Sequence, residues 1–356
     1  MESVFKDNKL LCVEALIKVP KAGLARDPTV LWPEIAASVL AFPVCYLLTW
    51  YLTRFLRKRG MVVPDAHKEG KPLVPRPGGP AILAAITVSG GLIYFVSGDI
   101  RAAAFVLVAL IAGAVGLVDD LRTLNGPLKV VLLFLAAVPI IVLEAYAPRI
   151  SLPFGASLTI TIVYPFLVLL AIPITANTFN MIDVYNGLLT GFAALAAVPL
   201  LIAFIVVGDW VMFSVTVAYL LLLAGFYPFH MNPSKVFPGD SGSLALGAAY
   251  GAIVISGSMD LVGVVALIPA ILNSFFVLSS VRSFMEHRNM KKRPVRLRDD
   301  YLLEASKDKD SPMTLSRMVL AGGPLSEQDV VSAIFVIELV AVCLSLVTFI
   351  MLRWTP

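Results

Sequence analysis

The stretch from Asn177 to Gly191 places amide side chains and a carboxylate between two very apolar segments. Asn177, Asn180 and Asp183 recur at every third residue, so on a helix end they would lie roughly on one face, with Asn186-Gly187 closing the turn. Polar groups beside hydrocarbon are costly unless they meet protein, water or an ion. A capped turn between two membrane helices is the simpler interpretation. Four polar groups in register instead favour a binding site for a polar ligand.

Asp119 and Asp120 end another apolar segment, and Lys129 follows nine residues after Asp120. This set suits a site that handles a cation and a phosphate. One carboxylate can face a metal or accept a proton, while the lysine balances phosphate charge. A solvated helix end would explain the two aspartates equally well.

The segment from Phe237 to Ser243 reads Phe-Pro-Gly-Asp-Ser-Gly-Ser and puts Asp240 in a glycine-flanked turn before an apolar stretch. Glycines let backbone amides approach an oxygen-rich ligand, and a helix N-terminus favours anions. An aspartate that only caps the helix is the alternative. His230, which precedes this turn, is as readily an interfacial residue as a participant in chemistry.

A cationic run precedes the last apolar segment. It contains His287, Arg288, Lys291, Lys292, Arg293, Arg296 and Arg298. Such a run is typical of a cytoplasmic membrane anchor or a lipid-headgroup patch. Beside phosphate chemistry it also suits a pyrophosphate clamp, because guanidinium groups bind phosphate oxygens with two hydrogen bonds.

The composition requires elements that hold these residues at a membrane surface. The 356-residue chain is 58% hydrophobic and only 15% charged, and its mean hydropathy is +0.87. These values exclude a soluble globular protein and predict an all-α, polytopic integral membrane protein. Cys12, Cys45 and Cys343 show no paired spacing, so neither a disulfide framework nor a zinc site is expected.

A membrane-spanning helix needs about 20 mostly apolar residues, and the sequence predicts about ten transmembrane helices. The predicted spans are 33–56, 80–97, 101–118, 128–146, 159–177, 188–207, 210–229, 242–257, 261–284 and 330–353. Residues 1–30 are expected to form an extracytosolic segment, and residues 31–356 a single membrane-embedded domain.

The loop from Arg54 to Gly78 holds seven Lys or Arg residues against Asp65 and Glu69, which predicts a cytoplasmic position. Alternation of ten helices then places the remaining polar-rich segments on the same side. These are 118–129, 177–187, 230–241 and 285–326. The candidate site is therefore expected at the cytosolic face, with both termini outside.

Taken together, these motifs resemble the polyprenyl-phosphate N-acetylhexosamine-1-phosphate transferase superfamily. The resemblance rests on Gly116-Leu-Val-Asp-Asp120, on Asn177 to Gly187 and on Val236 to Ser243, in this order along the chain, and it covers roughly residues 33–353. The first loop, from Asp65-Ala-His-Lys68 to Pro75-Arg-Pro-Gly-Gly79, is also similar to that of the family.

Asn186-Gly187, Lys129 and the stretch from Met313 to Glu327 are more similar to the eukaryotic and archaeal dolichyl-phosphate N-acetylglucosamine phosphotransferases. Asp183 is a departure from the eukaryotic pattern, because it is typical of the bacterial enzymes. The bacterial transferases that initiate cell-wall or surface-polysaccharide synthesis therefore remain the alternative branch.

The resemblance implies transfer of an N-acetylhexosamine 1-phosphate, with N-acetylglucosamine favoured, from a UDP-sugar to a polyprenyl or dolichyl phosphate. The products would be a lipid diphosphosugar and UMP, in the first membrane step of glycan assembly, with N-glycans favoured. It also implies Mg²⁺ or Mn²⁺ as cofactor, membrane lipid but no nucleic acid as partner, and a homodimer as one open assembly state.

The resemblance also implies roles for individual residues. Asn180 and Asp240 match the metal ligands, Asn186 matches the contact to uracil, and Asn177 and Asp183 match the substrate site. Lys129, Arg288, Lys292 and Arg293 match phosphate contacts, and Asp119 or Asp120 would hold or deprotonate the lipid phosphate.

A transporter or flippase is the alternative class of protein. Transporters place ionisable groups near the middle of the bilayer, whereas the motifs above lie at segment ends. Glu338, deep in the last predicted span, is the exception, and an interhelical contact would explain it.

Overall fold

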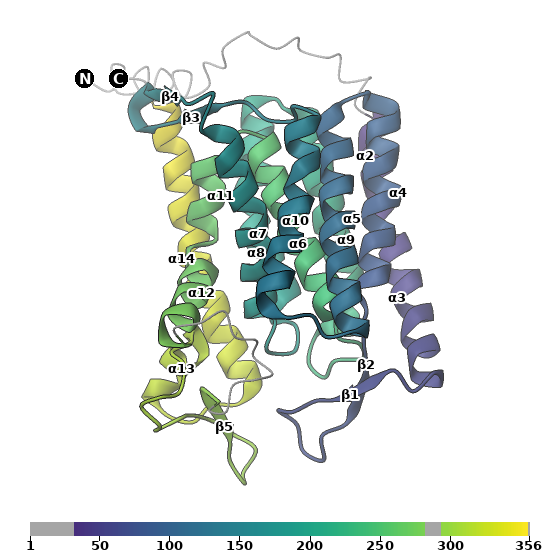
Figure 1. Cartoon of the computed structure of the whole chain (residues 1–356), viewed down its shortest axis with the longest axis vertical. Coiled ribbons are helices and arrows are strands. Elements are labelled where there is room, and N and C mark those ends of the chain that lie inside the picture. The colour runs from purple at the N-terminus through teal and green to yellow at the C-terminus, as the bar shows by residue number, and fades with distance from the viewer. Residues whose placement is uncertain (1–31, 282–292, 355–356) are drawn as a thin grey trace, which may run out of the picture.

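The computed structural model describes residues 32–281 and 293–354, which form a bundle of helices with small hairpins at its two ends (Figure 1). The helices are α2 (Trp32–Val39), α3 (Ala41–Lys58), α4 (Gly79–Ser97), α5 (Ile100–Leu121), α6 (Gly126–Val142), α7 (Tyr164–Ile182), α8 (Leu188–Val207), α9 (Trp210–His230), α10 (Gly239–Ser256), α11 (Asp260–Ala266), α12 (Ile268–Val281), α13 (Leu315–Val319) and α14 (Glu327–Arg353). The antiparallel strand pairs are β1 (Val62–Pro64) with β2 (Leu73–Pro75), β3 (Arg149–Ser151) with β4 (Ser157–Thr159), and β5 (Val295–Leu297) with β6 (Leu303–Ala305).

Every predicted span contains helix over most of its length, so the prediction of a helical, polytopic membrane protein is confirmed. Within the described ranges, seven helices are long and apolar enough to cross a membrane, or eight if α11 and α12, bent by 66° against each other, form one span. The 17-residue α6 falls below that length, and α10 is not among the seven. The number of ten spans and the single-domain boundary stay predictions, and the 1–30 segment lies outside the described residues.

Helix α10 is the central element of the bundle, because every residue in it except Asp240 is buried. Helices α4, α5, α7, α8 and α9 contact it, so protein rather than lipid surrounds it. Glycines allow this close approach, as in other membrane helix pairs. A Cβ atom on Gly116 of α5 would lie 2.3 Å from the carbonyl oxygen of Asp240. The small residues at these contacts, together with Asp240 in the first turn, explain why α10 is not among the helices apolar enough to count as a membrane span.

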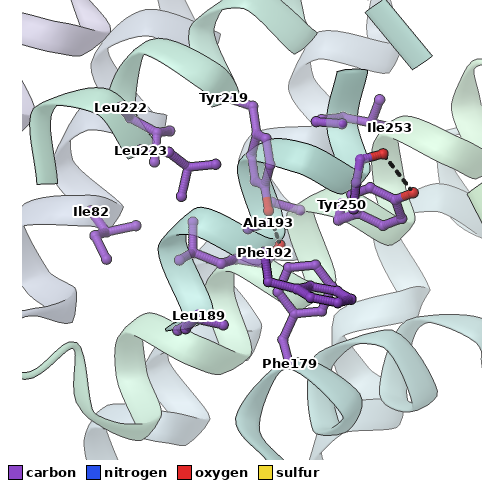
Figure 2. Close-up of a cluster of buried hydrophobic side chains, with 14 of the residues drawn as sticks. Ile82, Phe179, Leu189, Phe192, Ala193, Tyr219, Leu222, Leu223, Tyr250 and Ile253 are labelled. Carbon is purple, nitrogen blue, oxygen red and sulfur yellow. Dashed lines mark hydrogen bonds between the residues drawn. The ribbon is translucent and has the colours of Figure 1, made fainter. Parts of the chain in front are cut away.

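Aromatic side chains from four helices meet around α10, as Figure 2 shows for Phe179, Phe192, Tyr219 and Tyr250. The buried phenol groups donate to backbone carbonyls. Tyr219 donates to Leu246 at 3.1 Å, and Tyr250 donates to Ala196 at 3.2 Å. Buried polar groups need such partners, and these bonds fix α8, α9 and α10 relative to one another.

The two ends of the bundle differ in chemistry. The β1–β2 and β5–β6 hairpins and α13 lie at one end, and the β3–β4 hairpin lies at the other (Figure 1). At the β3–β4 end, Arg101 is paired with Asp99 and Asp209, joining the start of α5 to the start of α9. The predicted motif residues Asp120, Asp183 and Asp240 all lie at helix ends near the β1–β2 hairpin.

Candidate active site

Asp240, in the first turn of α10, is the centre of a chain of alternating charges. Its Oδ1 lies 2.8 Å from Nη2 of Arg76, and its Oδ2 lies 2.5 Å from Nζ of Lys129. Arg76 reaches on to Asp120 at 2.9 Å, and Lys129 reaches on to Asp119 at 3.0 Å. The end of α5, the start of α6, the β2–α4 loop and the start of α10 are thereby joined through their charged side chains. The sequence predicted four of these five residues, and Arg76 was missed although it stands in the quoted Pro-Arg-Pro-Gly-Gly motif.

Asp119 and Asp120 are neighbours in sequence, but their side chains hydrogen-bond to different segments of the chain. Asp120 accepts hydrogen bonds from the backbone N–H groups of Asp240 and Ser241, at 2.9 and 3.0 Å, and from the Ser241 hydroxyl. It therefore caps the otherwise unsatisfied N-terminus of α10. Asp119 accepts from the backbone N–H of Leu124 at 2.7 Å and closes the α5–α6 turn. Neither side chain is more than 1% exposed. The structure thus places both behind Asp240 and Lys129, and their role toward a lipid phosphate stays a prediction.

A pocket of about 350 Å³ opens in front of Asp240. The first loop, the C-terminal part of α7 and the α7–α8 turn form its walls. The predicted site residues among those that line it are Lys129, Asn177, Asn180, Asp183, Asn186 and Asp240. The members of the asparagine cluster therefore face one common space, as their spacing predicts, and their roles toward a ligand stay predictions.

The amides of α7 are oriented by nearby side chains. Asn180 donates from Nδ2 to the hydroxyl of Ser243 in α10 at 2.8 Å, which leaves its carbonyl oxygen as the acceptor atom of the side chain. Asn177 donates to the sulfur of Met181 at 3.3 Å. The Asn180 amide oxygen and the Asp240 carboxylate, on the wall of one pocket, are hard oxygen donors of the kind that Mg²⁺ prefers.

Within residues 32–281 and 293–354, no group of three or more His, Cys, Asp or Glu side chains is arranged to hold a metal ion. Asp240 and Asn180 still fit such an ion, because Mg²⁺ in phosphate sites is commonly bound by one or two carboxylates together with substrate phosphates.

Asp183 follows the last residue of α7, and its carboxylate lies 3.6 Å from Nε2 of His230. Burial raises the pKa of Asp183 from 3.8 to about 8; the Arg76 guanidinium opposes this shift, and the Asp240 and Asp120 carboxylates add to it. Burial thus favours the protonated form of the Asp183 carboxyl near neutral pH.

This shift predicts a pH-dependent stability. An unfolded chain loses the Asp183 proton near pH 4 and the folded protein near pH 8, so the contribution of Asp183 to the unfolding free energy falls as the pH rises between these values. Asp183→Asn cannot ionise, so its melting temperature in detergent should exceed that of the wild type by more at pH 8 than at pH 5. The exposed Asp300, changed to asparagine, is the control. An equal difference at both pH values would show that Asp183 is already ionised in the folded protein.

A second polar network closes the side of the pocket next to the first loop. Asn186, 4% exposed, donates from Nδ2 to Asp65 at 2.9 Å, and its backbone N–H donates to Glu327 at 2.8 Å. Glu327, at the start of α14, is paired with Lys68 at 2.6 Å. Sequence reasoning did not assign Asp65, Lys68 and Glu327 to the site. The signal was present, because all three stand in the segments that carry the family resemblance.

Of the phosphate contacts predicted in the cationic loop, the structure describes only Arg293. Arg288 and Lys292 lie outside the described residues. Arg293 lines a separate hollow of about 450 Å³ together with Arg296, and this hollow adjoins the main pocket through Ala66 and His67. Arg293 therefore lies beside the pocket of Asp240 and does not line it.

Comparison with known proteins agrees with this geometry. Residues 102–258 match the model of glycosyl transferase family 4. This stretch is similar to the members of that family. It contains the aspartate pair, Lys129, the asparagine cluster and Asp240, so the family match covers most of the charged network and of the pocket wall.

Three relatives extend the match beyond this family stretch. The chain is 29% identical over 234 residues to a candidate UDP-N-acetylglucosamine–dolichyl-phosphate N-acetylglucosaminephosphotransferase of Sulfolobus acidocaldarius, covering 63% of this chain and 71% of that protein. It is 28% identical over 257 residues to the enzyme of the same name from Saccharolobus solfataricus, covering 69% and 77%. A candidate undecaprenyl-phosphate N-acetylglucosaminyl 1-phosphate transferase of Bacillus subtilis is 26% identical over 277 residues, covering 72% and 77%. The resemblance to the polyprenyl-phosphate hexosamine-1-phosphate transferases is thereby confirmed.

Proposed function

We propose that this protein transfers N-acetylglucosamine 1-phosphate from UDP-N-acetylglucosamine to a polyprenyl or dolichyl phosphate, releasing UMP. The observation that supports this most directly is Asp240, held between Arg76 and Lys129 at the wall of a pocket that amides also line. This pocket lies at the end of a bundle of apolar helices. A water-soluble nucleotide and a lipid-borne phosphate can meet only at such a boundary.

The side chains of the pocket suit a diphosphate. Arg76 and Lys129 would bind phosphate oxygens, because each is a charged donor whose position is already fixed by two carboxylates. Asn180 and Asp240 would hold Mg²⁺ or Mn²⁺, which would neutralise charge on the pyrophosphate. Asn177 and Asp183 would contact the remainder of the substrate from the α7 wall.

The relatives favour dolichyl phosphate as the lipid acceptor, because two of the three relatives are named as dolichyl-phosphate enzymes. The Bacillus subtilis relative keeps the bacterial branch as the second candidate. A transporter is disfavoured by the position of the charged network at one end of the bundle. Glu338 is fully buried within α14, and neither of its oxygens has a hydrogen-bond partner among the residues that the structure describes. It lies in the middle of α14, whereas the charged residues around Asp240 lie at the ends of other elements.

We also propose that the site faces the cytosol, which the Lys and Arg bias of the first loop supports. A single cysteine at Asn125 should react with a membrane-impermeant reagent only from the cytosolic side, and one at Ser157 only from outside. Labelling of both positions from one side would refute this topology.

The activity is tested with purified protein, UDP-N-acetylglucosamine, a polyprenyl phosphate and Mg²⁺. UMP should be released with formation of the lipid product, and EDTA should stop the reaction. Release of UMP only with UDP-N-acetylmuramoyl-pentapeptide would assign the protein to the bacterial cell-wall branch. No UMP from any UDP-sugar would refute the transferase proposal.

A further inference from the structure

The amide of Asn186 has one permitted orientation in this structure. Its Nδ2 lies 2.9 Å from Oδ2 of Asp65, and both side chains are only 4% exposed. A carboxylate accepts hydrogen bonds and donates none. Rotating the amide by 180° would bring two oxygen atoms to that distance in a buried place, at a cost comparable to a lost hydrogen bond plus repulsion. Asp65 therefore fixes Asn186 with its nitrogen toward the Asp65 carboxylate, and Oδ1 remains as the acceptor that the side chain offers to a ligand.

The residues that line the pocket differ in charge. Arg76 and Lys129 lie beside Asp240 and provide the only Lys or Arg side chains among the described lining residues. Asp65 and Asn186 line the same pocket and are hydrogen-bonded to each other, while Lys68, on the same loop as Asp65, is engaged by Glu327. Phosphates therefore fit beside Arg76 and Lys129, which leaves the uncharged, hydrogen-bonding part of a nucleotide to contact Asn186.

We propose that Asp65 is a specificity-determining positioning residue that selects uracil over cytosine by fixing the amide of Asn186. This inference rests on the proposed function, because it takes a UDP-sugar as the substrate. Uracil has an N–H donor at N3, from which the remaining acceptor of Asn186, Oδ1, can accept a hydrogen bond. Cytosine has an unprotonated acceptor nitrogen at N3, which would face that oxygen without a hydrogen. A site built for one hydrogen-bonding pattern rejects the opposite pattern strongly, because buried polar groups are left unpaired.

The contacts of Asp65 allow a substitution that reverses the hydrogen-bonding pattern that Asn186 offers to a ligand. Its Oδ1 accepts from the backbone N–H of His67 at 3.2 Å, and its Oδ2 faces Asn186. In Asp65→Asn the new amide keeps its oxygen on His67 and turns its nitrogen toward Asn186. Asn186 must then rotate to accept that bond, which presents its own nitrogen to the base. The substitution changes neither size nor shape, yet it reverses the pattern that the base meets.

The experiment measures kcat/KM of full-length protein with UDP-N-acetylglucosamine and with CDP-N-acetylglucosamine. In Asp65→Asn the preference for the uridine substrate should fall by about tenfold or more, a change of about 1.4 kcal/mol or more. Glu327→Gln is the matched control. It alters a carboxylate that touches Asn186 at the backbone N–H and not at the amide, so the preference should persist. An unchanged preference in a folded, active Asp65→Asn would overturn the inference and leave the proposed transferase intact. A wild type without activity on UDP-N-acetylglucosamine would instead refute the proposed function.

A measurement on the wild type covers the case in which Asp65→Asn does not fold. UMP should inhibit the reaction, whereas CMP and N3-methyl-UMP, which both lack the N3 hydrogen, should inhibit at least tenfold more weakly. Equal inhibition by UMP and N3-methyl-UMP would overturn the inference, because the base would then be recognised without its N3 hydrogen.

Discussion

Asp240→Asn should reduce turnover of UDP-N-acetylglucosamine by on the order of a hundredfold or more, the scale seen when an electrostatic partner of a transition state is removed. The substitution keeps the volume of the side chain and removes the negative charge between Arg76 and Lys129. The structure gives that charge two tasks, because it fixes both cations at the pocket wall and is the proposed carboxylate ligand of the metal. Steady-state UMP release with saturating lipid phosphate is the measurement.

A matched control is available at the opposite end of the bundle. Asp209 is also paired with an arginine, Arg101, at 2.5 Å. Asp209→Asn removes the same charge from the same kind of ion pair and should leave turnover close to that of the wild type. If Asp240→Asn kept wild-type turnover and metal dependence, the Gly-Asp-Ser-Gly turn would be only the start of a helix. The metal would then have to be sought among the other carboxylates near the pocket.

Lys129→Met is expected to lose both stability and activity. The Nζ of Lys129 lies between Asp119 and Asp240, and the lysine and Asp119 side chains are 9% and 1% exposed. Removing one partner from a buried ion pair costs about 3–5 kcal/mol, because the remaining charge is left without compensation. The melting temperature in detergent should fall clearly, and UMP release should be abolished.

A second substitution separates the two effects. Lys129→Met combined with Asp119→Asn removes the uncompensated carboxylate at the α5–α6 turn, while the asparagine oxygen can still accept from the backbone of Leu124. Stability should recover in part, and activity should not, because the proposed phosphate contact is still missing. Recovery of activity together with stability would show that Lys129 acts only as a structural counter-ion.

The sequence was sufficient for the class of the protein and for several residues of its pocket. A chain that is 58% hydrophobic, with long apolar runs broken by polar turns, has to fold as membrane helices, because only internally hydrogen-bonded segments are stable in lipid. The three-residue spacing of Asn177, Asn180 and Asp183 likewise fixes a shared face on any helix, and the structure confirms that all three line one pocket. Such local periodicity does not depend on the neighbours of a helix.

Contacts between segments far apart in the chain could not be predicted from hydropathy or helical spacing. Arg76 meets Asp240 across 164 positions of the chain, and Asn186 meets Asp65 across 121. Only the packing of whole helices decides such partners. At Gly116, for example, the absence of a side chain lets α5 approach the backbone of α10, which brings Asp120 to the N-terminus of that helix.

The sequence by itself therefore determined the membrane class, the positions of the helices and the residues on the α7 face, because these follow from hydropathy and helical spacing. Only the tertiary structure decided that Asp119 and Asp120 point to different segments, that α10 is enclosed by protein, and that Arg76, Asp65 and Glu327 belong to the site. The physical reason is that the energy of a buried charge or amide is set by the atoms around it. In this fold those atoms come from segments far apart in the chain.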